Sequence, residues 1–491
     1  MAEQLYSEAA DVPLCVDLDG TLIRSDILIE SAFALLKQSP WLILAMPFWL
    51  FGGRQNLKHQ IAQRVSLDVE ALPYNDTVLG FLMEAQAKGR RLVLTTAANE
   101  EIAGAVAAHL GIFDDVMASD AAANLKGSRK QERLVDRYGE AGFDYAGDAW
   151  ADLQVWPHAR NAILVQPSRR LRRIAEQRSN VVRVFEAETR SIALYLRAMR
   201  LHQWVKNLLI FIPLLAAQKV MEPQLILQAL IAFLAFGLCA SSVYVLNDLL
   251  DLTTDRRHAR KRLRPFAAGA IPIWHGVAMM PALLLVAATF ASFLSTTFIA
   301  VLCGYYVLTL AYSLWLKQRV LVDVLTLASL YTIRVIAGAA AVAVAPSFWL
   351  LAFSMFLFLS LAMVKRYAEL IEVESKGGEQ ILGRGYQVVD LETLTSLGAA
   401  SGYVSVLVLA FYINSPDVRI PYGLPQAIWL VCPIMLYWIS RVWFAARRGK
   451  MHDDPIVYAA KDNISRWCLA AVVLALALAI FGAPIRDIVA F

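Results

Sequence analysis

Residues 245–269 combine an acidic cluster with a basic run at the end of a long apolar stretch. The cluster has the spacing NDxxDxxxD, and six Lys or Arg residues follow between positions 256 and 264. Charged side chains beside a membrane core are costly and usually functional. On a continuous helix over 240–256, the three aspartates would fall within an arc of about 60°, which the asparagine widens to about 100°.

Such a stripe suits a hard divalent cation. Mg²⁺ takes one or two carboxylates together with phosphate oxygens of a substrate, and the basic run could hold the remaining phosphate charge, with Arg264 as a bidentate fork. The arginines alone are equally compatible with a cluster that only fixes membrane topology. The residues predicted to form this Mg²⁺–diphosphate site are Asn247, Asp248, Asp251, Asp255, Lys261 and Arg264.

A second group of polar residues follows apolar strands in the first 155 residues. One strand ends at Asp17 and Asp19, the next at Thr96, and the third at Asp148. Because the carboxyl ends of parallel strands meet at one edge of a sheet, these side chains should form one site. Further candidates are Asp152, Lys126 with Lys130 as an alternative, and Thr95 as an alternative to Thr96.

The elements that must position these residues differ between the two halves of the chain. The 491 residues are 58% hydrophobic and 18% charged, with a mean hydropathy of +0.51, a mixture typical of a soluble domain joined to membrane helices. We predict an α/β Rossmann-like domain with a helical cap, followed by an all-α integral membrane domain. The expected boundaries are 1–165 for the α/β domain, about 25–85 for its cap, 166–195 for a basic linker and 196–491 for the membrane domain.

Several classes of protein are excluded by composition. The five cysteines are scattered without a CxxC pair, and the seven histidines have no metal spacing, so neither a disulfide framework nor a zinc site is indicated. We recognise no nucleic-acid-binding module. The polar, acidic N-terminus lacks a secretory signal, so the α/β domain is expected in the cytoplasm.

Nine apolar runs between residues 200 and 485 are candidate membrane spans. The first, at 200–217, is interrupted by Lys206 and Asn207. Alternate loops are rich in Lys and Arg, which places those loops in the cytoplasm. Nine spans in the inner (plasma) membrane would leave the N-terminus and both sites inside and the C-terminus outside.

Two segments have open interpretations. Residues 38–53 contain about 14 nearly pure apolar residues, too few to span a bilayer, and form either a buried cap helix or a segment that dips into the membrane interface. Residues 166–195 are basic and lie either against anionic lipid or in solvent.

NDxxDxxxD followed by RPFAAG resembles the first signature of the UbiA superfamily of intramembrane prenyltransferases, over roughly residues 195–488. The resemblance implies an isoprenoid diphosphate held through Mg²⁺ and transfer of its prenyl group. The second acidic stretch of that family is replaced by MVKRYAELIEVE, which contains Lys365, Arg366 and Glu369, and Asp323 has no acidic partner at Leu327. A basic pair suits a phosphate better than a second metal ion.

The replaced second acidic stretch and the segment RLHQWVKNLLIFIPL together make the sequence resemble the decaprenyl-phosphate phosphoribosyltransferases. The resemblance implies phosphoribosyl diphosphate as donor and a polyprenyl phosphate as acceptor. Lys365 and Arg366, with Lys206 or Arg334, are then candidates for binding the 5-phosphate or the lipid phosphate. The stretch with Asp453 and Asp454 has no assigned role.

In the α/β domain, DxDGT, then Thr, Lys and GDxxxD resemble the four motifs of the haloacid dehalogenase (HAD) superfamily, over about 130 residues. The resemblance implies that Asp17 is the nucleophile and Asp19 the general acid and base. Thr96 and Lys126 would hold the phosphoryl oxygens. The implied Mg²⁺ site is Asp17, Asp19 and Asp148, supported by Asp152.

The two halves predict a bifunctional enzyme that moves 5-phosphoribose to a polyprenyl phosphate and then removes the 5-phosphate. Three alternatives remain: a prenyltransferase that uses a prenyl diphosphate and an aromatic acceptor, a membrane-anchored phosphatase, and a lipid-binding scaffold. Expected partners are these substrates and membrane lipids, with no nucleic acid; the oligomeric state is not predicted.

Overall fold

In the computed structural model, the chain is described over residues 12–119, 125–186, 191–381, 383–414, 424–451 and 454–481. It divides into two units. The first contains Met1–Met199 and Tyr244–Met280, and the second contains Arg200–Val243 and Pro281–Phe491.

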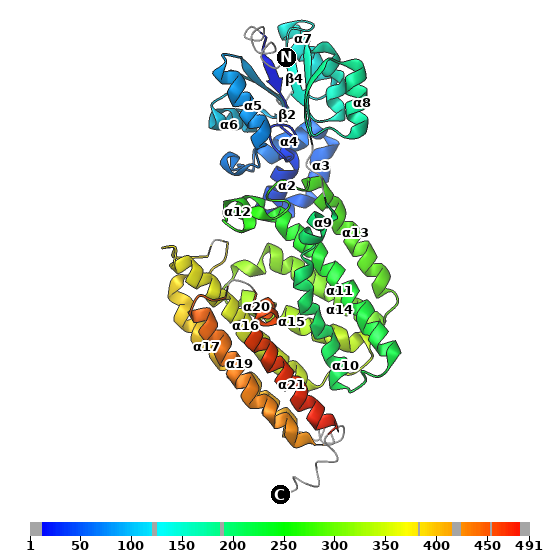
Figure 1. Ribbon diagram of the computed structural model, residues 1–491, viewed down its shortest axis with the longest axis vertical. Helices are drawn as coiled ribbons and strands as arrows, with labels where there is room; N and C mark the ends of the chain where they lie inside the picture. Colours follow the sequence, from blue (N-terminus) through cyan, green and yellow to red (C-terminus); the bar gives the residue numbers. More distant parts are fainter. Residues whose placement is uncertain are drawn as a thin grey trace. The chain divides into compact units, whose positions relative to one another are not determined.

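The first unit is built on a parallel sheet of six strands in the order β3-β2-β1-β4-β5-β6. The order places β1 between β2 and β4 (Figure 1), which confirms the predicted Rossmann-like α/β class. The strands are β1 (Leu14–Val16), β2 (Leu92–Asn99), β3 (Asp115–Ser119), β4 (Asp144–Gly147), β5 (Asn161–Val165) and β6 (Val181–Phe185).

Helices cover both faces of this sheet because successive strand residues point to opposite sides. Leu14 and Val16 join one hydrophobic cluster, whereas Cys15 joins another. The first cluster is covered by α5 (Asp76–Ala87) and α6 (Glu100–Leu110), and the second by α7 (Ser128–Tyr138) and α8 (Arg169–Arg178) (Figure 1).

A helical cap lies between β1 and α5 in the sequence. Leu35, Ile61 and Val65 form a small core of its own. Helix α5 instead buries Val78 and Leu82 in the sheet cluster, so the cap ends before it, earlier than the expected boundary near residue 85. The cap consists of α2 (Ile27–Gln38), a 3₁₀ helix (Pro40–Leu44), α3 (Met46–Phe51), α4 (Arg54–Ala62) and a 3₁₀ helix (Val69–Ala71).

Within the expected basic linker of residues 166–195, residues 166–186 belong to the α/β domain instead. Helix α8 buries Leu171 and Ala175 at a helical spacing and leaves most of its arginines exposed, and β6 adds an edge strand. The many arginines hid this amphipathic pattern. Helix α9 (Ile192–Ala198) follows.

Tyr244–Met280 belongs to the first unit although the sequence places it among the apolar runs. It packs on the cap through charge. Arg256 makes two bonds to Glu30 of α2, at 2.8 and 2.6 Å, and Arg257 donates to Asp68 at 2.6 Å. The segment holds the last turns of α11 (Pro223–Leu250), α12 (Leu252–Arg257), a 3₁₀ helix (Lys261–Leu263) and the first turns of α13 (Ile273–Ala291).

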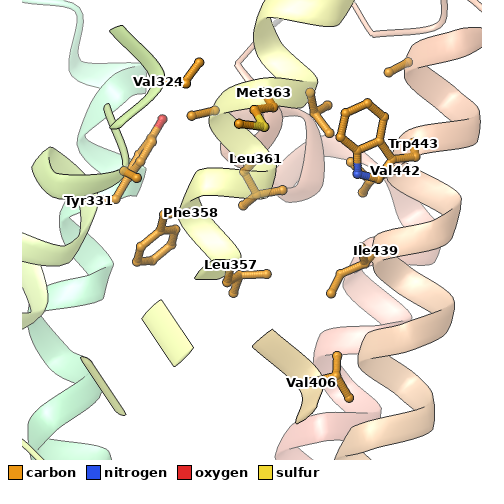
Figure 2. Close-up of a cluster of buried hydrophobic side chains, with 14 of the residues drawn as sticks. Val324, Tyr331, Leu357, Phe358, Leu361, Met363, Val406, Ile439, Val442 and Trp443 are labelled. Carbon is orange, nitrogen blue, oxygen red and sulfur yellow. The ribbon is translucent and has the colours of Figure 1, made fainter. Parts of the chain in front are cut away.

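The second unit is helical. Its core, part of which Figure 2 shows, gathers aromatic and aliphatic side chains from several of its helices, such as Tyr331, Phe358, Val406 and Trp443. Besides parts of α11 and α13, its helices are a 3₁₀ helix (Leu201–Phe211), α10 (Ile212–Ala216), α14 (Thr296–Leu314), two short 3₁₀ helices (Leu316–Gln318 and Val388–Asp390), α15 (Val322–Ala341), α16 (Phe348–Glu374), α17 (Leu391–Asn414), a 3₁₀ helix (Pro425–Leu430), α19 (Val431–Arg447), α20 (Pro455–Lys461) and α21 (Asn463–Phe481).

Eight helices of the described residues are long and apolar enough to cross a membrane, and the chain is a multi-pass integral membrane protein. The ninth expected span is the short apolar segment Leu201–Ala216. Most of it is a 3₁₀ helix in which Lys206 and Asn207 are buried. Its backbone packs so tightly on α15 that a Cβ at Gly338 would come within 2.0 Å of the Ile210 carbonyl oxygen. The expected location of the C-terminus falls on residues 482–491, which lie outside the described residues.

Candidate functional sites

Asp17 is at the centre of a cluster where the central strands end. It directly follows β1, and its backbone N–H donates to the Ala146 carbonyl of β4 at 3.0 Å. Asp148 lies two residues beyond Ala146, so β1 and β4 bring both carboxylates to one edge. Asp17, Asp148 and Asp152 each place a carboxylate oxygen within 4.8 Å of the other two. Among the described residues, this is the one group of three or more acids that converges in this way.

Lys130 is the lysine that reaches the acids. Its ammonium group lies 3.0 Å from Asp17 Oδ2 and 4.0 Å from Asp152 Oδ1, and it is almost fully buried. Lys126 is exposed at the rim of the adjoining cavity. Burial lowers the pKa of Lys130, but Asp17 and Asp152 more than offset this, so its pKa lies above the usual value. The structure therefore assigns the contact with Asp17 to the alternative lysine and not to Lys126.

Asp152 is held by backbone and side-chain donors. Its Oδ2 accepts from the N–H groups of Asp148 and Ala149 at 3.1 and 2.9 Å. Its Oδ1 accepts from the Tyr145 hydroxyl at 2.9 Å, which in turn accepts from Lys130 at 2.8 Å. Asp152 thus fixes the turn after β4 and orients the lysine.

Gly20 allows the loop after β1 to approach Asp148. Its φ is +73°, and a Cβ there would lie 2.2 Å from Asp148 Oδ2, so both the backbone conformation and the space require glycine. The neighbouring Thr21 hydroxyl donates to Asp148 Oδ1 at 3.3 Å.

The two threonines of β2 are both buried. Thr96 Oγ1 accepts from the Ala98 N–H at 3.0 Å, which holds the turn after the strand. Thr95 Oγ1 is buried without a hydrogen-bond partner among the described residues. The geometry leaves the choice between them open.

Asp19 accepts from the Ile27 N–H at 2.8 Å, at the first turn of the cap. Burial, followed by the nearby Asp26, raises the pKa of Asp19 to about 7. Burial also raises the pKa of Asp148, with Asp152 and Asp17 adding repulsion. Buried carboxylates that lie close together raise one another's pKa, and a bound cation would counteract this rise.

These oxygen donors fit Mg²⁺, which prefers carboxylates and phosphate oxygens. The converging set is Asp17, Asp148 and Asp152, whereas the predicted set had Asp19 in place of Asp152. Because Asp152 already accepts from two backbone N–H groups, Asp17 and Asp148 are the better ligands.

A cavity of about 620 Å³ opens from this cluster. Its wall includes Asp17 and Asp148, the cap residues Leu50 and Lys58, and Trp274 at the start of α13. The Lys58 ammonium donates to the Ala97 carbonyl at 2.6 Å, which brings a cap cation to the strand ends. The volume of the cavity lies in the range typical of small-molecule binding sites.

The acidic cluster of residues 247–255 is arranged differently from the prediction. Helix α11 ends at Leu250, and Asp251 has a non-helical backbone before α12. The continuous helix expected over 240–256 is therefore wrong. Asp251 Oδ1 pairs with Lys37 of the cap at 2.8 Å, so the three aspartates do not share one face.

Asp248 and Asp255 do converge. Arg264 Nη1 lies 3.3 Å from Asp248 Oδ1 and also donates to Asp255 Oδ2. Both carboxylates are buried, and burial raises the pKa of Asp255 despite the arginine. Two carboxylates around one cationic group fit a Mg²⁺ site completed by a substrate's phosphates. Asn247 Oδ1 is buried without a hydrogen-bond partner among the described residues.

The basic run after this cluster is only partly available. Arg256 and Arg257 bind the cap. Lys261, in the short 3₁₀ helix that follows, is exposed. Its role as a phosphate ligand stays a prediction.

In the second unit, Asp454 organises two of the predicted phosphate ligands. Its carboxylate lies 2.8 Å from Lys206 Nζ and 3.3 Å from Lys365 Nζ, and it accepts from the Tyr331 hydroxyl. Burial would raise the pKa of Asp454, but the two lysines more than offset it, and the pKa lies below its usual value. Asp453 lies outside the described residues.

Arg334 and Arg366 are buried in polar networks of the second unit. Arg334 donates to Asn207 Oδ1 and to the Tyr305 hydroxyl, both at 3.0 Å. Arg366 is fully buried and pairs with Asp323 and, at 2.6 Å, with Glu369. Its guanidinium group is already engaged by acids, so the prediction that the Lys365–Arg366 pair forms a free basic site is not supported for Arg366.

Three participants were missed by the sequence: Tyr145, Lys58 and Lys37. Tyr145 lies in β4 three residues before Asp148, and its position in that motif could have identified it. The two cap lysines belong to no motif, and only the packing of the cap reveals them.

Comparison with known proteins agrees with this arrangement. Residues 208–378 match the UbiA prenyltransferase family. Uncharacterized protein y4nM of Sinorhizobium fredii is 37% identical over 94% of this chain and 90% of its own length. Decaprenyl-phosphate phosphoribosyltransferase of Mycolicibacterium smegmatis is 30% identical over 55% of this chain and 86% of its own length.

Among solved structures, a HAD family hydrolase from Salmonella enterica serovar Typhi aligns with a TM-score of 0.27 and 16% identity, over 34% of this chain and 66% of its own. The first unit is an α/β domain with acids gathered at the strand ends, and its HAD-like function stays a prediction. The chain belongs to the UbiA prenyltransferase family, whose match covers residues 208–378 of the membrane half.

Proposed function

We propose that the protein is a bifunctional membrane enzyme that transfers 5-phosphoribose from phosphoribosyl diphosphate to a polyprenyl phosphate and then removes the 5-phosphate. The observation that carries the first activity is the 30% identity to a decaprenyl-phosphate phosphoribosyltransferase over most of that protein's length. The observation that carries the second is the Asp17–Lys130–Asp148 cluster.

In the transfer step, an oxygen of the lipid phosphate attacks the anomeric carbon of ribose. The new C–O bond forms as the bond from that carbon to the diphosphate oxygen breaks, and diphosphate leaves with the electron pair. The lipid phosphate is already an anion, so the step needs no strong general base. Orientation of the two substrates supplies much of the rate enhancement.

Asp248 and Asp255 are the residues of this chain that would hold Mg²⁺ for the transfer. Bound there, the ion would neutralise charge on the leaving diphosphate. Arg264 lies between the two carboxylates and would turn its guanidinium group to the diphosphate. Within the second unit, Asp454 gathers Lys206 and Lys365, and their role as phosphate ligands stays a prediction.

In the phosphatase step, an Asp17 carboxylate oxygen attacks the 5-phosphorus. The ester P–O bond breaks, and Asp19 protonates the leaving ribose oxygen. Water then hydrolyses the aspartyl phosphate and gives its proton to Asp19, which restores the site. Lys130 offsets charge on the phosphoryl oxygens, and Mg²⁺ held by Asp17 and Asp148 would add to this effect.

Charge distribution supports a cytoplasmic location for both steps. The basic loops predict that residues 256–264 face the cytoplasm, and the acidic cluster belongs to the same unit as Asp17. The product of the first site would therefore form on the side where the second site operates.

The test is mass spectrometry of lipids formed by the purified full-length protein in lipid nanodiscs. Phosphoribosyl diphosphate and polyprenyl phosphate should give a lipid-linked ribose, and Asp17→Asn should give the same lipid with its 5-phosphate retained. If Asp17→Asn still yields the dephosphorylated product, the second activity is wrong. If a prenylated ring forms only from prenyl diphosphate and an aromatic acid, the first is wrong.

A further inference from the structure

The cap carries an apolar surface that the described residues leave uncovered. In the 3₁₀ helix Pro40–Leu44 and α3, Leu42, Met46 and Trp49 pack on the small core of the cap. Three large aromatic residues of the same segment, spaced by seven and three positions, lie on the opposite, outward face. Trp41, Phe48 and Phe51 are 71%, 73% and 88% exposed. The segment is thus apolar on both faces, and only one face is used for packing.

The charged residues that flank this segment in the cap sequence are all basic, although Lys37 pairs with Asp251. Residues 31–67 contain no Asp or Glu and four Lys or Arg residues, Lys37, Arg54, Lys58 and Arg64. A helical surface with exposed aromatic residues and nearby basic residues matches the interface of a bilayer with anionic head groups. A soluble acidic protein partner would satisfy the charge but not the row of large aromatic groups.

Membrane-spanning helices begin and end beside this surface within the same unit. Leu50 of α3 and Trp274 in the first turn of α13 line the same cavity, and α13 is a candidate span. At the other end of the segment, Lys37 contacts Asp251, which directly follows α11, another candidate span. The exposed aromatic residues therefore lie close to where the chain leaves the bilayer.

We propose that Trp41–Phe51 inserts its exposed face into the cytoplasmic interface of the bilayer, so that the phosphatase cavity takes its phosphate monoester from a membrane-resident lipid. Inserting the large side chains removes their apolar area from water, and this favours binding. Leu50 lines the cavity next to the inserted residues, so the segment would guide a lipid-linked substrate to Asp17. The lipid class of the substrate rests on the proposed function, but the insertion itself does not.

The first experiment measures insertion without any substrate. In a Cys303→Ser, Cys468→Ser background, Phe51→Cys is labelled with an environment-sensitive fluorophore, and the full-length protein is placed in nanodiscs that contain anionic lipid. Met83→Cys on α5, where Met83 is 54% exposed, is the matched control. Lipids spin-labelled near the head group should quench the Phe51 label about twofold and the Met83 label hardly at all.

Equal quenching at both positions, or stronger quenching of the Phe51 label by aqueous iodide than by lipid, would overturn the insertion. This result is independent of what the two active sites do, so it separates the inference from the proposed function.

The second experiment asks whether insertion serves catalysis. The triple variant Trp41→Ser, Phe48→Ser, Phe51→Ser is compared with Met83→Ser on two substrates, the lipid-linked ribose 5-phosphate and soluble p-nitrophenyl phosphate. We expect the triple variant to lose about tenfold on the lipid only, because the soluble ester needs no interface. Equal loss on both substrates, or no loss on either, would contradict the guiding role.

Discussion

The acids at the ends of the β-strands and the acids at the end of α11 have similar composition but different organisation. Asp17 and Asp148 are fixed by the registers of β1 and β4 and share a buried lysine. Asp248 and Asp255 share an arginine across a helix break, and Asp251 turns to the cap. Parallel strands bring residues of distant segments to one edge, whereas a helix keeps a stripe of acids together only while it remains continuous.

The largest expected effect tests the strand-end site. Lys130→Ala should reduce phosphatase turnover about 10³-fold, because it removes a buried cation beside the nucleophile. Lys126→Ala should change it by less than about threefold, because an exposed charge is screened by solvent. Turnover of p-nitrophenyl phosphate by both variants measures the difference. If Lys126→Ala is the more damaging change, the lysine contact in the structure does not represent the working site.

The contact between the cap and residues 244–280 should account for the next largest effect. Arg256→Ala leaves Glu30 buried without its cationic partner, with only the Ser25 hydroxyl donating to it, and breaking a buried ion pair costs about 3–5 kcal/mol. The side chains are only 7% and 3% exposed. Thermal unfolding of the full-length protein in nanodiscs should show a clearly lower Tm, while Arg262→Ala, at an exposed position, should leave it unchanged. An unchanged Tm for Arg256→Ala would show that the pair does not hold the cap.

The helix-end site is tested by replacing its aspartates one at a time. Asp248→Asn and Asp255→Asn should each lower transfer about 10–100-fold and raise the Mg²⁺ concentration needed for half-maximal activity, because each removes an oxygen ligand. Asp251→Asn should have a smaller effect on both. Transfer of labelled ribose to lipid across a Mg²⁺ titration provides the measurement. Equal effects of all three changes would mean that the three aspartates act as one set of ligands, as first predicted, and that the helix-end site is not divided at Asp251.

The sequence predicted which strand-end acids lie together, because the pattern of apolar strands and terminal acids is local and periodic. Apolar strands and their terminal acids fixed the α/β class and the positions of Asp17 and Asp148. The choice between Lys126 and Lys130 could not be made from the sequence, since Lys126 lies just before α7 and Lys130 in its first turn, and only packing buries one of them. Long apolar runs likewise revealed the membrane half but not its polar networks.

The errors came from features that composition conceals. The arginines of α8 made a sheet-forming segment look like a linker, and the apolar runs hid that residues 244–280 pack with the α/β domain. No proline or glycine in the sequence marks the helix break at Asp251. Asp251 and Lys37 are 214 positions apart in the sequence, and no local pattern connects them.

The smallest expected effect decides whether the Lys37–Asp251 pair controls the helix-end site. The ammonium and carboxylate groups are 2.8 Å apart, but their side chains are 39% and 26% exposed. A pair that is open to solvent contributes about 0–1 kcal/mol, so Lys37→Ala should leave the Tm and the transfer rate nearly unchanged, as should Lys88→Ala, a control after α5. Thermal unfolding and ribose transfer in nanodiscs measure both quantities. A severalfold rise in transfer by Lys37→Ala alone would mean that the cap lysine competes with Mg²⁺ for Asp251. Asp251 would then be a third Mg²⁺ ligand that becomes available only when its pair with Lys37 opens. The strand-end acids are already together, so the two acidic sites would differ only in the step that brings their ligands together.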